Sequence, residues 1–190
     1  MGEVQTLTMS VEEFYEWQRD QEERYELIDG VPVRLRGMTG ASNFHDAILI
    51  NVIAHLWIAL RGKPCRVVSA DTAVRTAIRS TRRPDVTVDC APAEANFYEA
   101  RRPTVVVEVL SPSTRKIDQF TKLEEYRRHP TLRHILLIDP DSISAKLYSR
   151  PEGGAWSDVD LLGADATIAL SAIDVDLRLG DIYERLTMTS

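Results

Sequence analysis

Hydrophobic residues recur along this chain first at helical spacing and then at strand spacing. Ser10 and Glu13 form a capping box, and the apolar positions behind it predict a first helix that ends near Asp20. Two apolar segments then flank Asp29-Gly30, a dipeptide typical of tight turns, which predicts a β-hairpin. Because Pro32 has no backbone N–H to donate, we expect the second hairpin strand at a sheet edge.

Helical spacing returns after the hairpin. It predicts a long second helix that Ser42 can cap and that Gly62 and Pro64 stop. The apolar positions of this helix, which we expect to pack into the core, are Ile48, Val52, Ile53, Leu56, Trp57 and Leu60.

The remainder of the chain is dominated by strand-like runs of β-branched residues. These runs cover residues 66–68, 72–75, 86–88, 105–110, 134–138, 145–150 and 157–161. The 105–110 run shows no polar alternation before Glu108, so it should be a central strand covered on both faces.

A third helix is predicted over residues 118–129, where Pro130 ends it. Its candidate packing residues are Phe120, Leu123 and Tyr126. Because this helix separates two buried strands, the segment from 104 to 138 predicts a right-handed crossover between parallel strands. A short helix near residues 181–186 closes the chain.

Composition narrows the class of protein. A chain of 190 residues with 44% hydrophobic content suits a single α/β domain over residues 1–190. The longest apolar segment is interrupted by Asn51 and His55, and the start lacks a signal peptide, so we expect a cytoplasmic protein with no membrane partner. Cys65 and Cys90 have no metal-type spacing and are predicted to be reduced thiols rather than a disulfide or a zinc site.

The net charge of −6 argues against a protein that coats nucleic acid broadly, since phosphate neutralisation needs clustered Lys and Arg. Local basic pairs nevertheless flank the acidic strands, either as part of a binding surface or as solvated loop charge. These pairs are Arg82-Arg83, Arg101-Arg102 and Arg115-Lys116.

Two carboxylates interrupt apolar strands, which is costly unless a cation or hydrogen bonds hold them. Asp85 precedes Glu108 by 23 residues, and Lys122 follows Glu108 by 14, on the next helix. If the two strands are neighbours, both acids can share one face with Lys122 leaning over them. Paired carboxylate oxygens favour Mg²⁺ or Mn²⁺ over zinc, and such a site suits phosphodiester hydrolysis.

Ordered motifs from about Met9 to Leu186 resemble the Uma-two family of predicted restriction endonucleases. The segments that carry the resemblance are Tyr25 to Gly30, Arg83-Pro84-Asp85, Val107 to Thr114, Lys122 to Tyr126 and Leu137 to Pro140. The family is placed in the PD-(D/E)XK nuclease superfamily. The resemblance therefore implies a restriction-endonuclease-like α/β core, with a mixed central sheet flanked by helices and an N-terminal helix and hairpin.

The resemblance also implies Mg²⁺-dependent cleavage of nucleic acid, with Asp85 and Glu108 as metal ligands. The carbonyl of Val109 would be a third ligand. The superfamily pattern places its catalytic lysine at position 110, which is leucine here. The family resemblance assigns the role of that lysine to Lys122 instead. Alternatively, Lys122 merely pairs with acids of its own helix, or Tyr126 packs over it.

Further candidates surround these residues. Glu26 lies in an apolar strand and belongs to the family motif, although it could also be an edge charge facing water. His45 could reach the active-site mouth or a phosphate, or could simply cap its helix or face solvent. Ser111 could donate to a phosphate or cap the next helix, and Arg83 and Arg115 are further candidates for substrate binding.

Three hypotheses follow. The first is a metal-dependent endonuclease acting on DNA, for which a twofold dimer would be the simplest way to cut both strands. The second is a catalytically weak nucleic-acid-binding or regulatory module that keeps the nuclease fold. The third is a structural or interaction protein in which Asp85, Glu108 and Lys122 form a buried ion network, an arrangement that rarely stabilises a fold better than apolar packing.

Overall fold

A six-stranded mixed sheet forms the centre of the computed structural model, which describes residues 8–35, 43–94, 98–111 and 117–187. Its strands, in spatial order, are β10 (Ser157–Leu162), β9 (Ser144–Ser149), β8 (His134–Asp139), β7 (Pro103–Val109), β6 (Val86–Asp89) and β3 (Arg66–Ser69). The β7–β8 pair is parallel and the other neighbouring pairs are antiparallel. The predicted parallel pairing of the two strands that flank the third helix is therefore confirmed.

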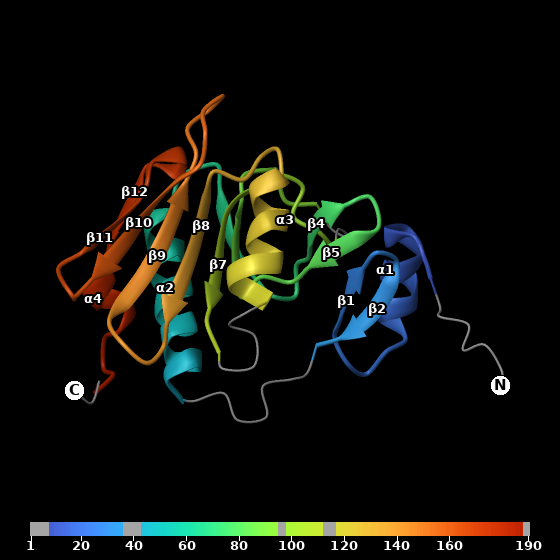
Figure 1. Cartoon of the computed structure of the whole chain (residues 1–190), viewed down its shortest axis with the longest axis horizontal. Helices are drawn as coiled ribbons and strands as arrows, with labels where there is room; N and C mark the ends of the chain where they lie inside the picture. The colour runs from blue at the N-terminus through green and yellow to red at the C-terminus, as the bar shows by residue number, and fades with distance from the viewer. Residues whose placement is uncertain (1–7, 36–42, 95–97, 112–116, 188–190) are drawn as a thin grey trace.

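Helices cover both faces of this sheet (Figure 1). The α2 helix (Asn43–Ala59) packs on one face together with the β11–β12 hairpin (Thr167–Leu170 and Val175–Arg178) and α4 (Leu179–Ile182). On the other face lie a π-helical segment (Ile117–Lys122) and α3 (Leu123–Arg128). Every residue of β7 is buried, as expected for a central strand covered on both sides.

The N-terminal hairpin and two strands from residues 74–82 form a second, smaller sheet. Its spatial order is β2 (Val31–Arg34), β1 (Tyr25–Ile28), β5 (Ser80–Arg82) and β4 (Val74–Ala77), with α1 (Val11–Arg19) packed nearby. The Ser10–Glu13 capping box is present, and Pro32 lies on the edge strand β2. The predicted helix, hairpin and edge position are thus confirmed.

Individual side chains differ from prediction. Trp57 is 60% exposed because α2 buries the stripe through Ile48, Val52 and Leu56, and Trp57 lies next to that stripe. Phe120 is 68% exposed, since it lies in the π-helical segment, whose wider turn changes the helical spacing, whereas Tyr126 is buried as predicted.

Several short elements were also mispredicted or missed. Three elements were not predicted: the three-residue strand β5, the β11–β12 hairpin and the 3₁₀ turn over Ser171–Ile173. The closing helix covers Leu179–Ile182 rather than 181–186. The predicted cap Ser42 lies outside the described residues.

Cys65 and Cys90 form a disulfide, so the prediction of two reduced thiols is wrong. The strands that follow and precede them, β3 and β6, pair antiparallel with Arg66 opposite Asp89. Extending this register by one residue places the two cysteines across from each other, with their Cα atoms 4.0 Å apart. The contact depends on strand pairing, which the spacing of cysteines along the chain does not reveal.

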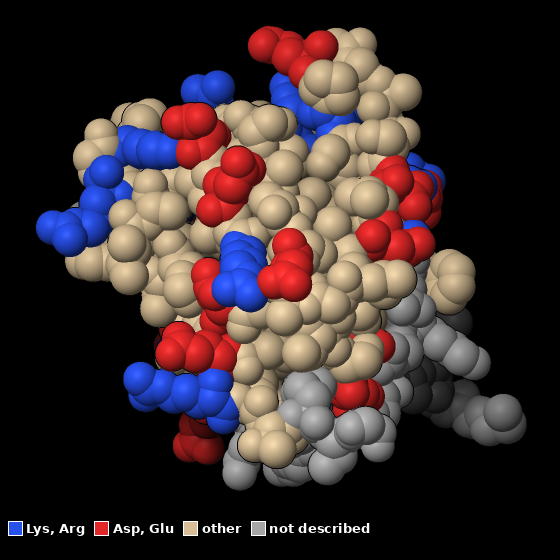
Figure 2. Space-filling view, turned by 90° about the vertical axis from the view of Figure 1, so that its left-hand side faces the viewer, with Lys and Arg blue, Asp and Glu red and all other residues tan. Residues whose placement is uncertain are grey.

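The surface at the β10–β12 end of the molecule carries both signs of charge. Figure 2 shows acidic and basic side chains interspersed over this face, with no continuous basic area. Within the part of the chain that the structure describes, no helix is long and apolar enough to cross a membrane.

Candidate active site

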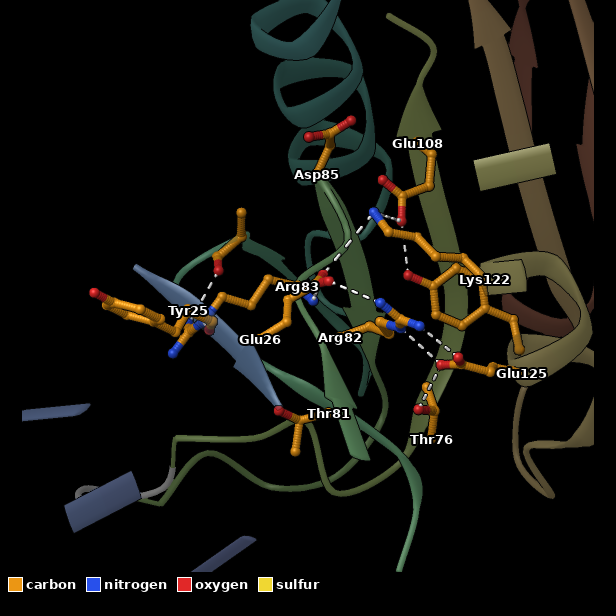
Figure 3. Close-up of polar contacts among 12 residues, drawn as sticks. Tyr25, Glu26, Thr76, Thr81, Arg82, Arg83, Asp85, Glu108, Lys122 and Glu125 are labelled. Atoms are coloured by element: carbon orange, nitrogen blue, oxygen red, sulfur yellow. Dashed lines mark hydrogen bonds and ion pairs between the residues drawn. The ribbon is translucent and has the colours of Figure 1, made fainter. Parts of the chain in front are cut away.

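Asp85 and Glu108 meet on adjacent strands of the central sheet. Asp85 directly precedes β6, Glu108 lies in β7, and the antiparallel register pairs Val86 with Val107. One further step places Asp85 opposite Glu108. The sequence-based expectation that the two strands are neighbours is therefore correct. Figure 3 shows Glu108 beside the Nζ of Lys122, with Asp85 on the neighbouring strand.

Asp85 is held at the end of β7 by the backbone. Its Oδ2 accepts a hydrogen bond from the Val109 N–H at 2.7 Å. His45 lies close by, with its Nε2 3.0 Å from the Val109 carbonyl oxygen and 3.7 Å from Asp85 Oδ2. His45 is only 3% exposed. It therefore reaches the site, and its interpretation as a surface histidine is wrong.

Glu108 is buried and receives two donors at one oxygen. The Tyr126 hydroxyl donates to Oε1 at 2.7 Å, and Lys122 Nζ donates to the same atom at 3.2 Å. Burial raises the pKa of Tyr126 well above its usual value, and the Glu108 charge raises it further. Tyr126 is thus a protonated donor that fixes the orientation of Glu108.

Lys122 lies between two acids from different sheets. Besides Glu108, its Nζ is 3.9 Å from Oε1 of Glu26 on β1. Glu26 is 4% exposed and also accepts hydrogen bonds from the Arg83 backbone N–H at 2.9 Å and from Arg82 Nη1 at 3.0 Å. The interpretation of Glu26 as an edge charge facing water is wrong, because β1 lies between β2 and β5.

Arg82 connects Glu26 to α3, and sequence reasoning missed this role. Its guanidinium donates to both carboxylate oxygens of Glu125, at 2.7 and 2.5 Å, and Thr76 donates to Glu125 Oε2 at 2.8 Å. Burial opposes the charged form of Arg82, but its contacts with Glu125 and Glu26 outweigh this and raise its pKa. Arg82 lies in the unpredicted strand β5, so only the tertiary fold distinguishes it from a solvated loop residue.

Burial also acts on Glu125 itself. It would raise the pKa of that carboxyl, yet the hydrogen bonds and charge of Arg82 lower it below its usual value. Glu125 and Arg82 therefore form a charged pair that links the small sheet to α3 beside Lys122.

The predicted substrate-binding residues differ in how the structure places them. Arg83 donates through its guanidinium to the carbonyl oxygens of Tyr25, Ala70 and Asp71, contacts that hold the backbone of the small sheet in place. Ser111 is half-buried and lies two residues after the end of β7. Arg115 lies outside the described residues.

The donor set that could hold a cation consists of oxygens: the carboxylates of Asp85 and Glu108 and the carbonyl of Val109. Among the residues that the structure describes, there is no group of three or more His, Cys, Asp or Glu side chains arranged to bind a metal. A soft-metal or zinc cage is therefore not formed by these side chains. Two carboxylates with a carbonyl suit a hard cation that keeps several waters.

Most of the chain is similar to a known protein family. Residues 11–180 match the Uma2 family, whose description is "Putative restriction endonuclease". The uncharacterized protein slr1290 of Synechocystis sp. is 29% identical over 180 residues, covering 94% of this chain and 93% of the relative. A second Synechocystis protein, sll1609, also uncharacterized, is 25% identical over 176 residues, covering 90% and 97%.

A solved structure shows the same fold. The crystal structure of a putative nuclease belonging to DUF820 from Anabaena variabilis superposes with a TM-score of 0.71, over 92% of this chain and 97% of that one. The two sequences are 18% identical. The prediction of a nuclease-type α/β fold with a mixed central sheet is thus confirmed.

Proposed function

The chain belongs to the Uma2 family of "Putative restriction endonuclease" proteins, and we propose that it is a Mg²⁺-dependent endonuclease that hydrolyses phosphodiester bonds of DNA. The observation that carries the proposal is the meeting of Asp85 and Glu108 on paired strands, with Lys122 Nζ 3.2 Å from Glu108. The two carboxylates can hold a metal ion, and the ammonium can stabilise the negative charge that develops during phosphodiester hydrolysis.

The oxygen donors fit the proposed ion. Asp85, Glu108 and the Val109 carbonyl would hold Mg²⁺ or Mn²⁺, both of which prefer oxygen ligands and retain water. With such an ion bound, the site would hold a water molecule of lowered pKa and would polarise a phosphoryl oxygen. The Val109 N–H and the Tyr126 hydroxyl orient the two carboxylates, so the ligands are held in place by the fold.

Lys122 supplies a positive charge at the candidate active site. Its ammonium orients the attacking water or stabilises negative charge on the phosphoryl group as the bond to the leaving oxygen breaks. Glu26 and Glu108 hold Nζ from two sides, and we assign Glu26 to the positioning of Lys122. The lysine that the superfamily pattern places at position 110 is a buried leucine here, packed in the apolar cluster with Leu123 and Leu137.

That same leucine favours a second candidate function. With position 110 committed to apolar packing, the protein could bind nucleic acid and turn over weakly or not at all. The two candidate functions differ in one respect: the endonuclease cleaves DNA, whereas the binding module binds DNA without cleaving it.

A cleavage assay separates them. Supercoiled, linear and single-stranded DNA, and RNA of the same sequence, are incubated with wild type in Mg²⁺, Mn²⁺ or EDTA, and binding is measured in parallel by gel shift. The endonuclease predicts metal-dependent cutting of DNA that Lys122→Met abolishes. Binding without cutting on every substrate would replace the endonuclease with the binding module, and neither binding nor cutting would leave the buried ion network as a structural feature.

A further inference from the structure

A pocket at the opposite end of β7 from Glu108 is lined by three arginines. Arg102 precedes β7, Arg133 precedes β8 and Arg150 follows β9, and together they line a cavity of about 380 Å³. The remaining lining residues are Thr104, Thr131, Pro151, Glu152, Ser171 and Ala172. Thr104 in the pocket and Glu108 are four positions apart on β7, about 13 Å along the strand, so the pocket is distinct from the candidate active site.

The three guanidiniums have no acidic partner in the described part of the chain. None of Arg102, Arg133 and Arg150 forms an ion pair there, although ion pairs are frequent among the other charged side chains that the structure describes. Glu152 lines the pocket and is exposed, but it does not pair with any of the three within 4 Å. Three like charges therefore share a pocket without compensation.

Arg150 is fixed rather than mobile in this position. Its Nη2 donates to the carbonyl oxygens of His129 at 2.7 Å and Leu132 at 2.8 Å, and its guanidinium lies 4.8 Å from the centre of the Trp156 ring. Its Nε is buried without a hydrogen-bond partner among the described residues. Burial lowers the pKa of Arg150, and the nearby Arg133 charge lowers it further.

Arg133 and Arg102 retain donors for a ligand. Arg133 Nη1 donates to the carbonyl oxygens of Pro130 and Leu132, at 2.8 and 3.1 Å, and these hydrogen bonds orient the guanidinium. Its Nε and Nη2 donate no hydrogen bond within residues 8–35, 43–94, 98–111 and 117–187. The Arg102 side chain makes no hydrogen bond or ion pair within those same ranges. An anion with several acceptor oxygens would satisfy these donors and remove the like-charge repulsion.

We propose that this pocket binds a phosphate-type oxyanion, with Arg102 and Arg133 donating to its oxygens and Arg150 contributing a fixed positive charge. The planar, forked guanidinium matches phosphate geometry better than an ammonium does. The phosphate can be carried by a nucleic acid or by a small phosphorylated molecule, and the chemistry of recognition is the same. The inference does not depend on the proposed endonuclease activity.

Calorimetric titration with inorganic phosphate in EDTA, at constant ionic strength, tests the pocket itself. Wild type should bind phosphate, and Arg102→Gln and Arg133→Gln should each weaken binding about tenfold, since a hydrogen bond to a charged group contributes about that factor. Arg185→Gln, which removes an exposed arginine outside the pocket, is the matched control and should bind as wild type does. No heat of binding with wild type, or equal loss in Arg185→Gln, would overturn the proposal.

A fluorescently labelled DNA duplex, also in EDTA, identifies the source of the phosphate. If the ligand is a backbone phosphate, Arg102→Gln weakens duplex binding and free phosphate competes with the duplex. If it is a small phosphorylated molecule, duplex binding stays unchanged while phosphate affinity falls. Because EDTA prevents metal-dependent cutting, a failure of the endonuclease proposal leaves these binding results interpretable.

Discussion

At the scale of single residues, the candidate site depends on one oxygen atom of Glu108 that two donors share. Tyr126 and Lys122 both reach Oε1, and Lys122 in turn approaches Glu26 from another sheet. A lysine whose ammonium is held between two acids is already positioned at little further entropic cost. This geometry supports the proposed role of a lysine on the helix in place of one on the strand.

Replacing Lys122 with methionine keeps most of the aliphatic length and removes the charge. We expect Lys122→Met to lower the DNA cleavage rate by about 10²- to 10³-fold, the usual effect of losing one preorganised stabilising group. Lys146→Met, which removes a surface lysine paired with Asp158 and Asp160, should cut at the wild-type rate. Initial rates on supercoiled plasmid measure both, and equal rates for the two variants would remove Lys122 from the mechanism.

Arg82 tests the cost of breaking the buried network. Arg82→Met leaves the carboxylates of Glu26 and Glu125 without their main cation, so we expect a loss of about 3–5 kcal/mol in the free energy of unfolding. Arg34, which pairs with Glu23 on the surface, is the matched control, and Arg34→Met should cost at most about 1 kcal/mol. Urea denaturation measures both, and similar losses would mean that the buried network contributes no more than a surface pair.

At the scale of secondary-structure elements, long periodic segments were predictable and short ones were not. The capping box, the Asp29-Gly30 hairpin and the apolar β7 and β8 strands follow from local pattern, and all are present. The three-residue strand β5 has no pattern of its own and forms because it pairs with β1 and β4. For that reason the sequence predicts Asp85, Glu108 and Lys122 as a group but does not predict Arg82.

The histidines illustrate the same difference. His134, on β8, accepts a hydrogen bond at Nε2 from the Ala172 N–H and lies 2.9 Å from Ser149 Oγ through Nδ1. These two contacts support a structural role for His134. His45 was harder to assign because its partner, the Val109 carbonyl, is 64 residues away along the chain.

His134 makes a pH-dependent contribution to stability. Burial lowers its pKa to about 4, whereas the unfolded chain binds the proton near its ordinary pKa of about 6.5. The contribution is therefore complete above about pH 6.5 and is lost as the pH falls toward 4, on the order of 1–3 kcal/mol. Burial and the Arg150 charge lower the pKa of His129 to about 4 as well, so it acts in the same direction.

His134→Gln should flatten this dependence, because an amide can accept the Ala172 hydrogen bond without titrating. The free energy of unfolding, measured in urea from pH 7.5 to pH 4.5, should fall less steeply for the variant than for wild type. Parallel curves for the two proteins would show that His134 does not titrate differently on folding.

At the scale of the whole molecule, strand pairing creates contacts between segments far apart in the sequence. The β6–β7 register brings Asp85 to Glu108, and the β3–β6 register brings Cys65 to Cys90. Pattern analysis finds β3, β6 and β7 as strands but does not reveal which strand lies beside which. This explains why the acids were grouped correctly through their resemblance to a family and the cysteines were not.

The disulfide should contribute measurably to stability. It closes a loop of 25 residues in sequence separation, which predicts a contribution of about 3 kcal/mol, largely through the unfolded chain. Cys65→Ser/Cys90→Ser, or wild type in reducing agent, should lose that amount in urea denaturation under otherwise equal conditions. Two titratable thiols in the native, unreduced protein would contradict the pairing.

The most direct test of the central claim compares two acid-to-amide substitutions. Asp85→Asn changes one carboxylate of the candidate site at constant size, and Asp165→Asn does the same to an exposed acid paired with Arg178. In Mg²⁺, we predict that Asp85→Asn loses cleavage of supercoiled DNA by at least about 10³-fold while Asp165→Asn cuts as wild type does. If folded Asp85→Asn cuts DNA at the wild-type rate, the site is not where the chemistry occurs.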